Sequence, residues 1–392
     1  MATQWAVAPE RSAPTIPAID RLDQITRSLA ETAEDYDRSA QFPHANFDLL
    51  AREGLIGLTV AAEYGGAGAS LAQALRILGA VAKGEPSTAL ILFMTYAYHA
   101  APAKIRHWPK GVYERIARDA VAGRGLIGGL RVEPELGTPV RGGLPATIAR
   151  RTADGWTLDG TKIYSTGSTG LDWFAVWAKT DEETPRVGNF LVKADSPGIG
   201  IEPAWDHLGM RATVSHAVHF AGTPVPADHA VDIRRLEEWS VVADPSQAIW
   251  NALAISTIYT GVARAARDWL RAYLNDRVPS NLGASLATLP RVQEKFGEIE
   301  ALLQVNRTLI DAAAGRSDAG DPPSAVEVNT VKYVATANAI RAVEIGLELT
   351  GNPGISRKNP LERHYRDVLC SRIHSPQTDT ILVAAGRAGL GN

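Results

Sequence analysis

The chain has very little cysteine. Cys370 is the single cysteine among 392 residues, so no internal disulfide can form. A run of about 20 apolar residues, the length that a membrane-spanning helix needs, is also missing. No basic, apolar and small-residue leader opens the sequence. These absences exclude a disulfide scaffold and membrane helices, and we expect a soluble, cytoplasmic protein.

An excess of charge of one sign is missing as well. The 40 basic and 43 acidic residues are mixed along the chain and leave a net charge of -3. Proteins that bind nucleic acid by charge need clustered basic residues. We therefore expect a small-molecule partner, with no nucleic acid, no membrane and no metal site.

Hydrophobic periodicity divides the chain into successive parts. The first 19 residues, rich in Ala, Pro and Ser, predict a flexible arm. Helical spacing of apolar residues predicts a helical domain over 20–122, in which the segment 87–99 is apolar nearly all round and therefore buried. Short β-rich runs predict a middle β domain over 123–235, and helical patterns predict a bundle over 236–392.

Two local signals predict turns. Ser70 follows a Gly-rich segment and precedes an apolar helical pattern, so we expect it to cap a helix. Ala153, Asp154 and Gly155 separate two β-rich runs, which predicts a tight hairpin.

Four motifs resemble those of the acyl-CoA dehydrogenase superfamily. They are FDLLAREGLIG with EYGGAG at 47–57 and 63–68, DGTKIYSTG at 159–167, LGMRAT with a later Val-Pro at 208–226, and NPLERHYRD at 359–367. The resemblance covers almost the whole chain and implies a mainly α fold with a central β domain. Its parts would be an N-terminal helical domain, a middle β-barrel-like domain and a C-terminal four-helix bundle.

The resemblance implies a flavin cofactor, FAD or alternatively FMN. Thr166 falls where a family threonine hydrogen-bonds the flavin, and Tyr164 takes the place of a tryptophan beside it. Leu130, Val132 and Thr138 fall in the strand and loop that contact the cofactor. The alternative is an ordinary solvent-facing strand, in which hydroxyl residues serve β propensity.

Two further positions bear on the cofactor's phosphates. Arg277 resembles a family arginine that reaches the flavin of a neighbouring subunit, which implies a homo-oligomer, expected to be a tetramer. Alternatively, Arg277 only complements the dipole of the preceding helix. Glu348 replaces a family glutamine, and its charge would repel a pyrophosphate, which keeps FMN open.

The catalytic carboxylate of an acyl-CoA dehydrogenase is missing. In the family a glutamate removes the proton beside the thioester carbonyl, from one of two places. Here those places hold His374 and Asn251, and neither is acidic. The loss of a general base removes a factor of roughly 10² to 10⁴ in rate.

A histidine at this place resembles the branch of the superfamily that hydroxylates substrates with reduced flavin and O2, as dibenzothiophene monooxygenases do. His374 would then assist oxygen activation, and Tyr98 with His99 resembles an aromatic and histidine pair of that branch. Packed or solvated histidines are the alternative. We expect a monooxygenase fed by a separate flavin reductase. An acyl-CoA dehydrogenase with a displaced base and a non-catalytic flavin-fold partner remain alternatives.

Overall fold

The computed structural model describes residues 16–100, 108–138, 142–241 and 245–391. Most of the arm predicted over residues 1–19 lies outside these ranges. Within the described ranges, no helix is both long enough and apolar enough to cross a membrane.

Helices form the N-terminal part. Ser70 caps its third long helix with a capping box, in which the hydroxyl accepts from the Gln73 amide and the Gln73 side chain accepts from the Ser70 amide. The predicted cap is confirmed. The helices are α1 (Leu22–Ser39), α2 (His44–Arg52), α3 (Leu71–Gly84), α4 (Pro86–His99) and α6 (Lys110–Val121).

A single mixed sheet forms the middle part, with strand order β6-β7-β3-β2-β4-β5-β8 and β1 beside β4. The predicted hairpin at 153–155 is confirmed, because Thr152 donates its amide to the Gly155 carbonyl at 3.0 Å and the flanking strands pair antiparallel. The strands are β1 (Ile127–Leu130), β2 (Ile148–Arg151), β3 (Gly155–Ser165), β4 (Trp173–Thr180), β5 (Arg186–Lys193), β6 (Ile199–Glu202), β7 (His216–Pro226) and β8 (Ala230–Arg235).

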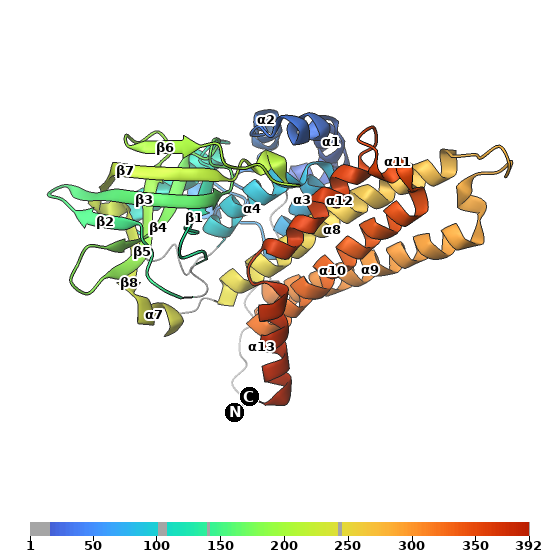
Figure 1. Cartoon of the computed structure of the whole chain (residues 1–392). Coiled ribbons are helices and arrows are strands. Elements are labelled where there is room, and N and C mark those ends of the chain that lie inside the picture. Colours follow the sequence, from blue (N-terminus) through green and yellow to red (C-terminus); the bar gives the residue numbers. More distant parts are fainter. Residues whose placement is uncertain (1–15, 101–107, 139–141, 242–244, 392) are drawn as a thin grey trace, which may run out of the picture.

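Long helices return after the sheet. Three of them, α8 (Pro245–Asp276), α9 (Pro290–Asp318) and α10 (Ala325–Thr350), lie side by side in the bundle, with α12 (Leu361–Leu369) against α8 and α10 (Figure 1). The short helices are α7 (Leu236–Val241) and α11 (Asn352–Ile355), and α13 (Thr378–Leu390) ends the chain. The predicted architecture of N-terminal helices, middle sheet and C-terminal bundle is confirmed.

Helix α4 joins the three parts. It packs against α3, α8 and β1, between the sheet and the bundle (Figure 1). Eleven of its 14 residues are buried, as expected for a helix that is apolar nearly all round. Helix α4 thereby links β1 of the sheet to α8 of the bundle.

Candidate functional site

The end of β3 presents an exposed aromatic ring. Tyr164 leaves 55% of its surface exposed and has a φ of 54°, in the left-handed region that bulky residues rarely adopt. Its ring lies edge-on to those of Trp205 and His207, at centroid distances of 6.3 and 6.0 Å. A flat cofactor beside Tyr164 would cover this ring, so the strand end fits the flavin expected there.

A chain of hydroxyl groups ends at Thr166. Thr213 donates its hydroxyl to the Met210 carbonyl at 2.8 Å, and Ser215 Oγ lies 2.9 Å from Thr213 Oγ1. The Thr213 proton is used in this bond, so Ser215 must donate its own proton to Thr213. Thr166 lies 3.1 Å from Ser215 and must therefore donate to it. Thr166 Oγ1 is therefore left with lone pairs only, and it suits an N–H donor, such as the one at N5 of a reduced flavin.

The other expected flavin contacts lie next to this strand end. Val132 accepts the amide of Ile163 at 3.0 Å, which holds the segment after β1 against β3. Leu130 is buried, and Thr138 is partly buried further along the loop. The structure thus brings Leu130 and Val132 together with Tyr164 and Thr166.

His374 follows the short η7 helix (Cys370–Ile373) and forms a hydrogen bond with Tyr259 of α8, with 2.6 Å between Nε2 and the phenolic oxygen. Burial lowers the pKa of His374 to about 3, with a further contribution from the charge of Lys332. Burial also raises the pKa of Tyr259 well above its ordinary value. Both groups are neutral at neutral pH.

The hydrogen bond between Tyr259 and His374 can run in either direction. If the Tyr259 hydroxyl donates to Nε2, the ring proton of His374 resides on Nδ1. If Nε2–H donates to the phenolic oxygen, Nδ1 carries a lone pair instead. In both arrangements the imidazole is neutral and holds one proton.

Lys332 of α10 holds the segment that carries His374. Its Nζ donates to the carbonyl oxygens of His374 and Pro376, at 2.5 and 2.6 Å. Lys332 is only 3% exposed, and burial lowers its pKa to about 8. At neutral pH the charged amine thus ties this segment to the bundle.

Tyr98 and His99 point to different neighbours. The His99 Nδ1 atom lies 3.3 Å from the Tyr113 hydroxyl of α6, and burial lowers the pKa of His99 to about 4. The Tyr98 hydroxyl faces β1, where a Cβ added at Gly129 would lie 2.7 Å from it. Among the described residues, no hydrogen bond or ring contact joins either side chain to His374.

The other three predicted site residues are Asn251, Arg277 and Glu348, and among the described residues no hydrogen bond joins them to His374 or Thr166. Asn251 is partly buried on α8, about two turns before Tyr259. Arg277 is exposed just after α8 and forms no ion pair with another described residue. Glu348 forms an ion pair with Arg341 at 2.5 Å on the surface of α10.

Three residues of this site were not predicted from the sequence: Tyr259, Lys332 and Ser215. Tyr259 lies 115 positions from His374 along the chain, and no local pattern relates the two. A lysine inside an otherwise apolar helical stretch was the one available signal for Lys332.

The chain matches three domains of one family. Residues 23–106 match the acyl-CoA dehydrogenase N-terminal domain, residues 132–223 its middle domain and residues 247–379 its C-terminal domain. The putative acyl-CoA dehydrogenase YdbM of Bacillus subtilis is 30% identical over 369 residues, which cover 93% of this chain and 94% of the relative.

Solved structures agree with this assignment. KijD3, in complex with FMN and dTDP-3-amino-2,3,6-trideoxy-4-keto-3-methyl-D-glucose, is 28% identical with a TM-score of 0.81, covering 97% of this chain and 95% of its own. The dibenzothiophene monooxygenase TdsC of Paenibacillus sp. A11-2 shares the fold, with a TM-score of 0.82, 23% identity and coverage of 95% and 97%. The predicted resemblance is confirmed: the chain belongs to the acyl-CoA dehydrogenase family and is a flavin-dependent oxidoreductase.

Proposed function

We propose that this enzyme is a monooxygenase that uses reduced flavin and O2 to oxygenate a small organic substrate. The observation that carries the proposal is the neutral Tyr259–His374 pair, because the resemblance implies that a dehydrogenase would have a carboxylate in this segment. In the overall reaction one oxygen atom enters the substrate, the other leaves as water, and reduced flavin provides the two electrons.

The chemistry of His374 argues against dehydrogenation. A general base works best when its pKa lies near the operating pH, whereas His374 has a pKa of about 3. Neither His374 nor Asn251 has a carboxylate as hydrogen-bond or ion-pair partner within the described part of the chain. A proton beside a thioester carbonyl therefore meets only a weak base in this site.

The same properties suit oxygenation. When bound, the flavin supplies the electrons and the position at which O2 is activated. We propose that Tyr259 donates to Nε2, so that the neutral His374 ring offers its Nδ1–H to an oxygen atom and orients it without a change of charge. Thr166 offers lone pairs to an N–H group, and we propose that Tyr98 and His99 line the substrate side of α4.

We propose FMN as the cofactor in preference to FAD. By the resemblance, Glu348 replaces a family glutamine near the phosphates of the cofactor, and a carboxylate there would repel the second phosphate of FAD. KijD3, at 28% identity, is solved with FMN. A separate flavin reductase would deliver the reduced form. Identification of the released flavin by mass spectrometry tests this proposal.

We propose a homotetramer. Helix α13 has 13 residues, of which only Ile381 is buried, and it projects from one end of the bundle, where it contacts α10 (Figure 1). Leu382, Val383 and Leu390 leave 46%, 53% and 80% of their surfaces exposed. A second subunit would cover these apolar side chains, and Arg277 would lie at the subunit boundary.

The test of the function is the fate of oxygen. Enzyme loaded with reduced FMN is mixed with O2 without substrate, and the rate of H2O2 release is recorded. We expect His374→Ala to release H2O2 about tenfold faster, because one hydrogen bond of roughly 1 to 1.5 kcal/mol is lost. His219→Ala, which removes a partly buried histidine of β7 that contacts Thr161 and Glu202, serves as the control.

Equal rates in the parent and His374→Ala would return His374 to a structural role. A protein that binds neither oxidised nor reduced flavin would support the non-catalytic alternative.

A further inference from the structure

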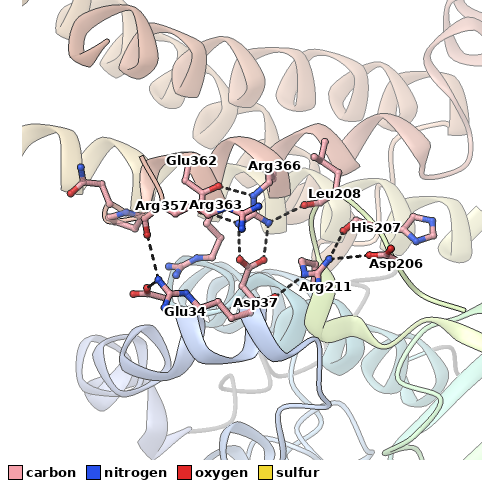
Figure 2. A pocket seen from close by; sticks show the side chains of 13 residues that line it. Glu34, Asp37, Asp206, His207, Leu208, Arg211, Arg357, Glu362, Arg363 and Arg366 are labelled. Carbon is pink, nitrogen blue, oxygen red and sulfur yellow. Dashed lines mark hydrogen bonds and ion pairs between the residues drawn. The ribbon is translucent and has the colours of Figure 1, made fainter. Parts of the chain in front are cut away.

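A charged pocket of about 720 Å³ lies between α1, the segment 206–211 and α12 (Figure 2). It differs from the region of Thr166 and His374, neither of which lines it. The lining includes five arginines and four carboxylates: Arg38, Arg211, Arg357, Arg363, Arg366, Glu34, Asp37, Asp206 and Glu362.

Three of the arginines already have carboxylate partners. Arg366 binds Asp37 through two hydrogen bonds of 2.9 and 2.6 Å and also binds Glu362. Arg38 pairs with Glu34, and Arg211 lies 3.4 Å from Asp206. The four carboxylates are thus matched, as the dashed lines of Figure 2 show.

Arg363 is different because its guanidinium has no such partner. Its side chain forms no hydrogen bond or ion pair with any residue that the structure describes, although it is only 9% exposed and its Nε is buried. The nearby Asp367 does not balance it fully, because burial raises the pKa of that carboxyl to about 7 despite the charge of Arg363. An unpaired buried charge of this kind destabilises the fold unless a ligand of opposite charge binds to it.

The other possible contacts of the pocket lie at its edge. His207 also lines the pocket, but its ring points away from Arg363 (Figure 2). The ring stacks on Trp205 with 3.5 Å between centroids and lies edge-on to Tyr164. Arg357, at the exposed rim, has no carboxylate partner among the described residues. Arg363 and Arg357 are therefore left for a ligand.

We propose that this pocket binds the phosphate group of a small organic molecule, with Arg363 as the principal contact. A guanidinium offers two parallel N–H donors to a phosphate, and a phosphate carries more charge than one arginine neutralises, which gives Arg357 a role at the rim. The volume exceeds that of phosphate alone, so the pocket also has room for the organic part of the ligand. This site is independent of the proposed oxygenation.

The test is a titration of the flavin-loaded enzyme with inorganic phosphate at constant ionic strength, followed by ³¹P line broadening. We expect the parent to bind phosphate and Arg363→Met to bind it at least tenfold more weakly. Arg118→Met, which removes an exposed arginine of α6, should behave as the parent. Arg363→Lys keeps the charge and should bind with intermediate strength.

If Arg363→Met does not fold, the comparison uses Arg363→Lys and Arg357→Met, and both should weaken binding. Phosphate binding that is equal in the parent and these variants, or a ³¹P line that the parent does not broaden, would overturn the proposal.

Discussion

At the scale of single residues, the site is defined by where protons reside. The Thr213–Ser215–Thr166 chain leaves Thr166 as an acceptor, because each hydroxyl proton can be donated only once. The Tyr259–His374 pair is neutral, and in the arrangement that we propose the ring proton of His374 lies on Nδ1.

Ser215→Ala should lower the reduction potential of the bound flavin. Without Ser215, the Thr166 hydroxyl is free to donate to the oxidised cofactor, which stabilises the oxidised form. The potential is measured by spectroelectrochemistry, with Ser168→Ala as control, because its hydroxyl donates to the Val214 carbonyl instead. A potential that is the same in the parent and Ser215→Ala would contradict the deduced direction of the chain.

His374→Gln should make the enzyme less sensitive to acid. His374 has a folded pKa of about 3, below the ordinary value of 6.5, so the unfolded chain binds the proton first. The contribution of neutral His374 to the unfolding free energy is therefore fully present above about pH 6.5 and is lost as the pH falls toward 3. Between pH 7.5 and 4.5 we expect the difference in unfolding free energy to change by about 2 kcal/mol in favour of the variant. Unfolding free energies are measured by urea denaturation. The same difference between parent and variant at both pH values would disprove this.

At the scale of elements, the sequence predicts local features well and meetings between distant elements poorly. The strands within 123–235 and the helices within 236–392 follow from periodicity, and the role of Ser70 follows from capping chemistry. The Tyr259–His374 pair could not be predicted, because it depends on how α8 packs beside α12 and η7. A helical period tells which face is apolar, and it does not tell which distant residue that face will meet.

Lys332→Met should release the segment that carries His374. Two carbonyl oxygens lose their charged donor, so the His374 ring becomes mobile while the helix that carries residue 332 keeps its shape. We expect H2O2 release from the reduced enzyme to rise toward that of His374→Ala, with flavin affinity unchanged. Lys332→Arg retains the charge, so its rate of H2O2 release should lie between those of the parent and Lys332→Met. A release rate like that of the parent would show that Lys332 serves only the packing of the bundle.

At the scale of the whole molecule, the exposed apolar surface of α13 is the feature that a single chain leaves incomplete. Val383→Glu should shift the sedimenting species toward smaller assemblies, because a charge would be buried in the subunit contact. Thr380→Glu alters an exposed polar position of the same helix and serves as the matched control. A parent enzyme that sediments as an active monomer of 41.9 kDa would refute the proposed tetramer.

The central claim is that this acyl-CoA dehydrogenase fold no longer performs dehydrogenation. Its most direct test is an anaerobic titration of the enzyme, loaded with oxidised flavin, with short and medium acyl-CoA esters. The account predicts that the flavin absorbance near its long-wavelength maximum stays unchanged, because His374 and Asn251 supply no competent base. Bleaching of the flavin by any of these esters would contradict the account and restore the dehydrogenase alternative.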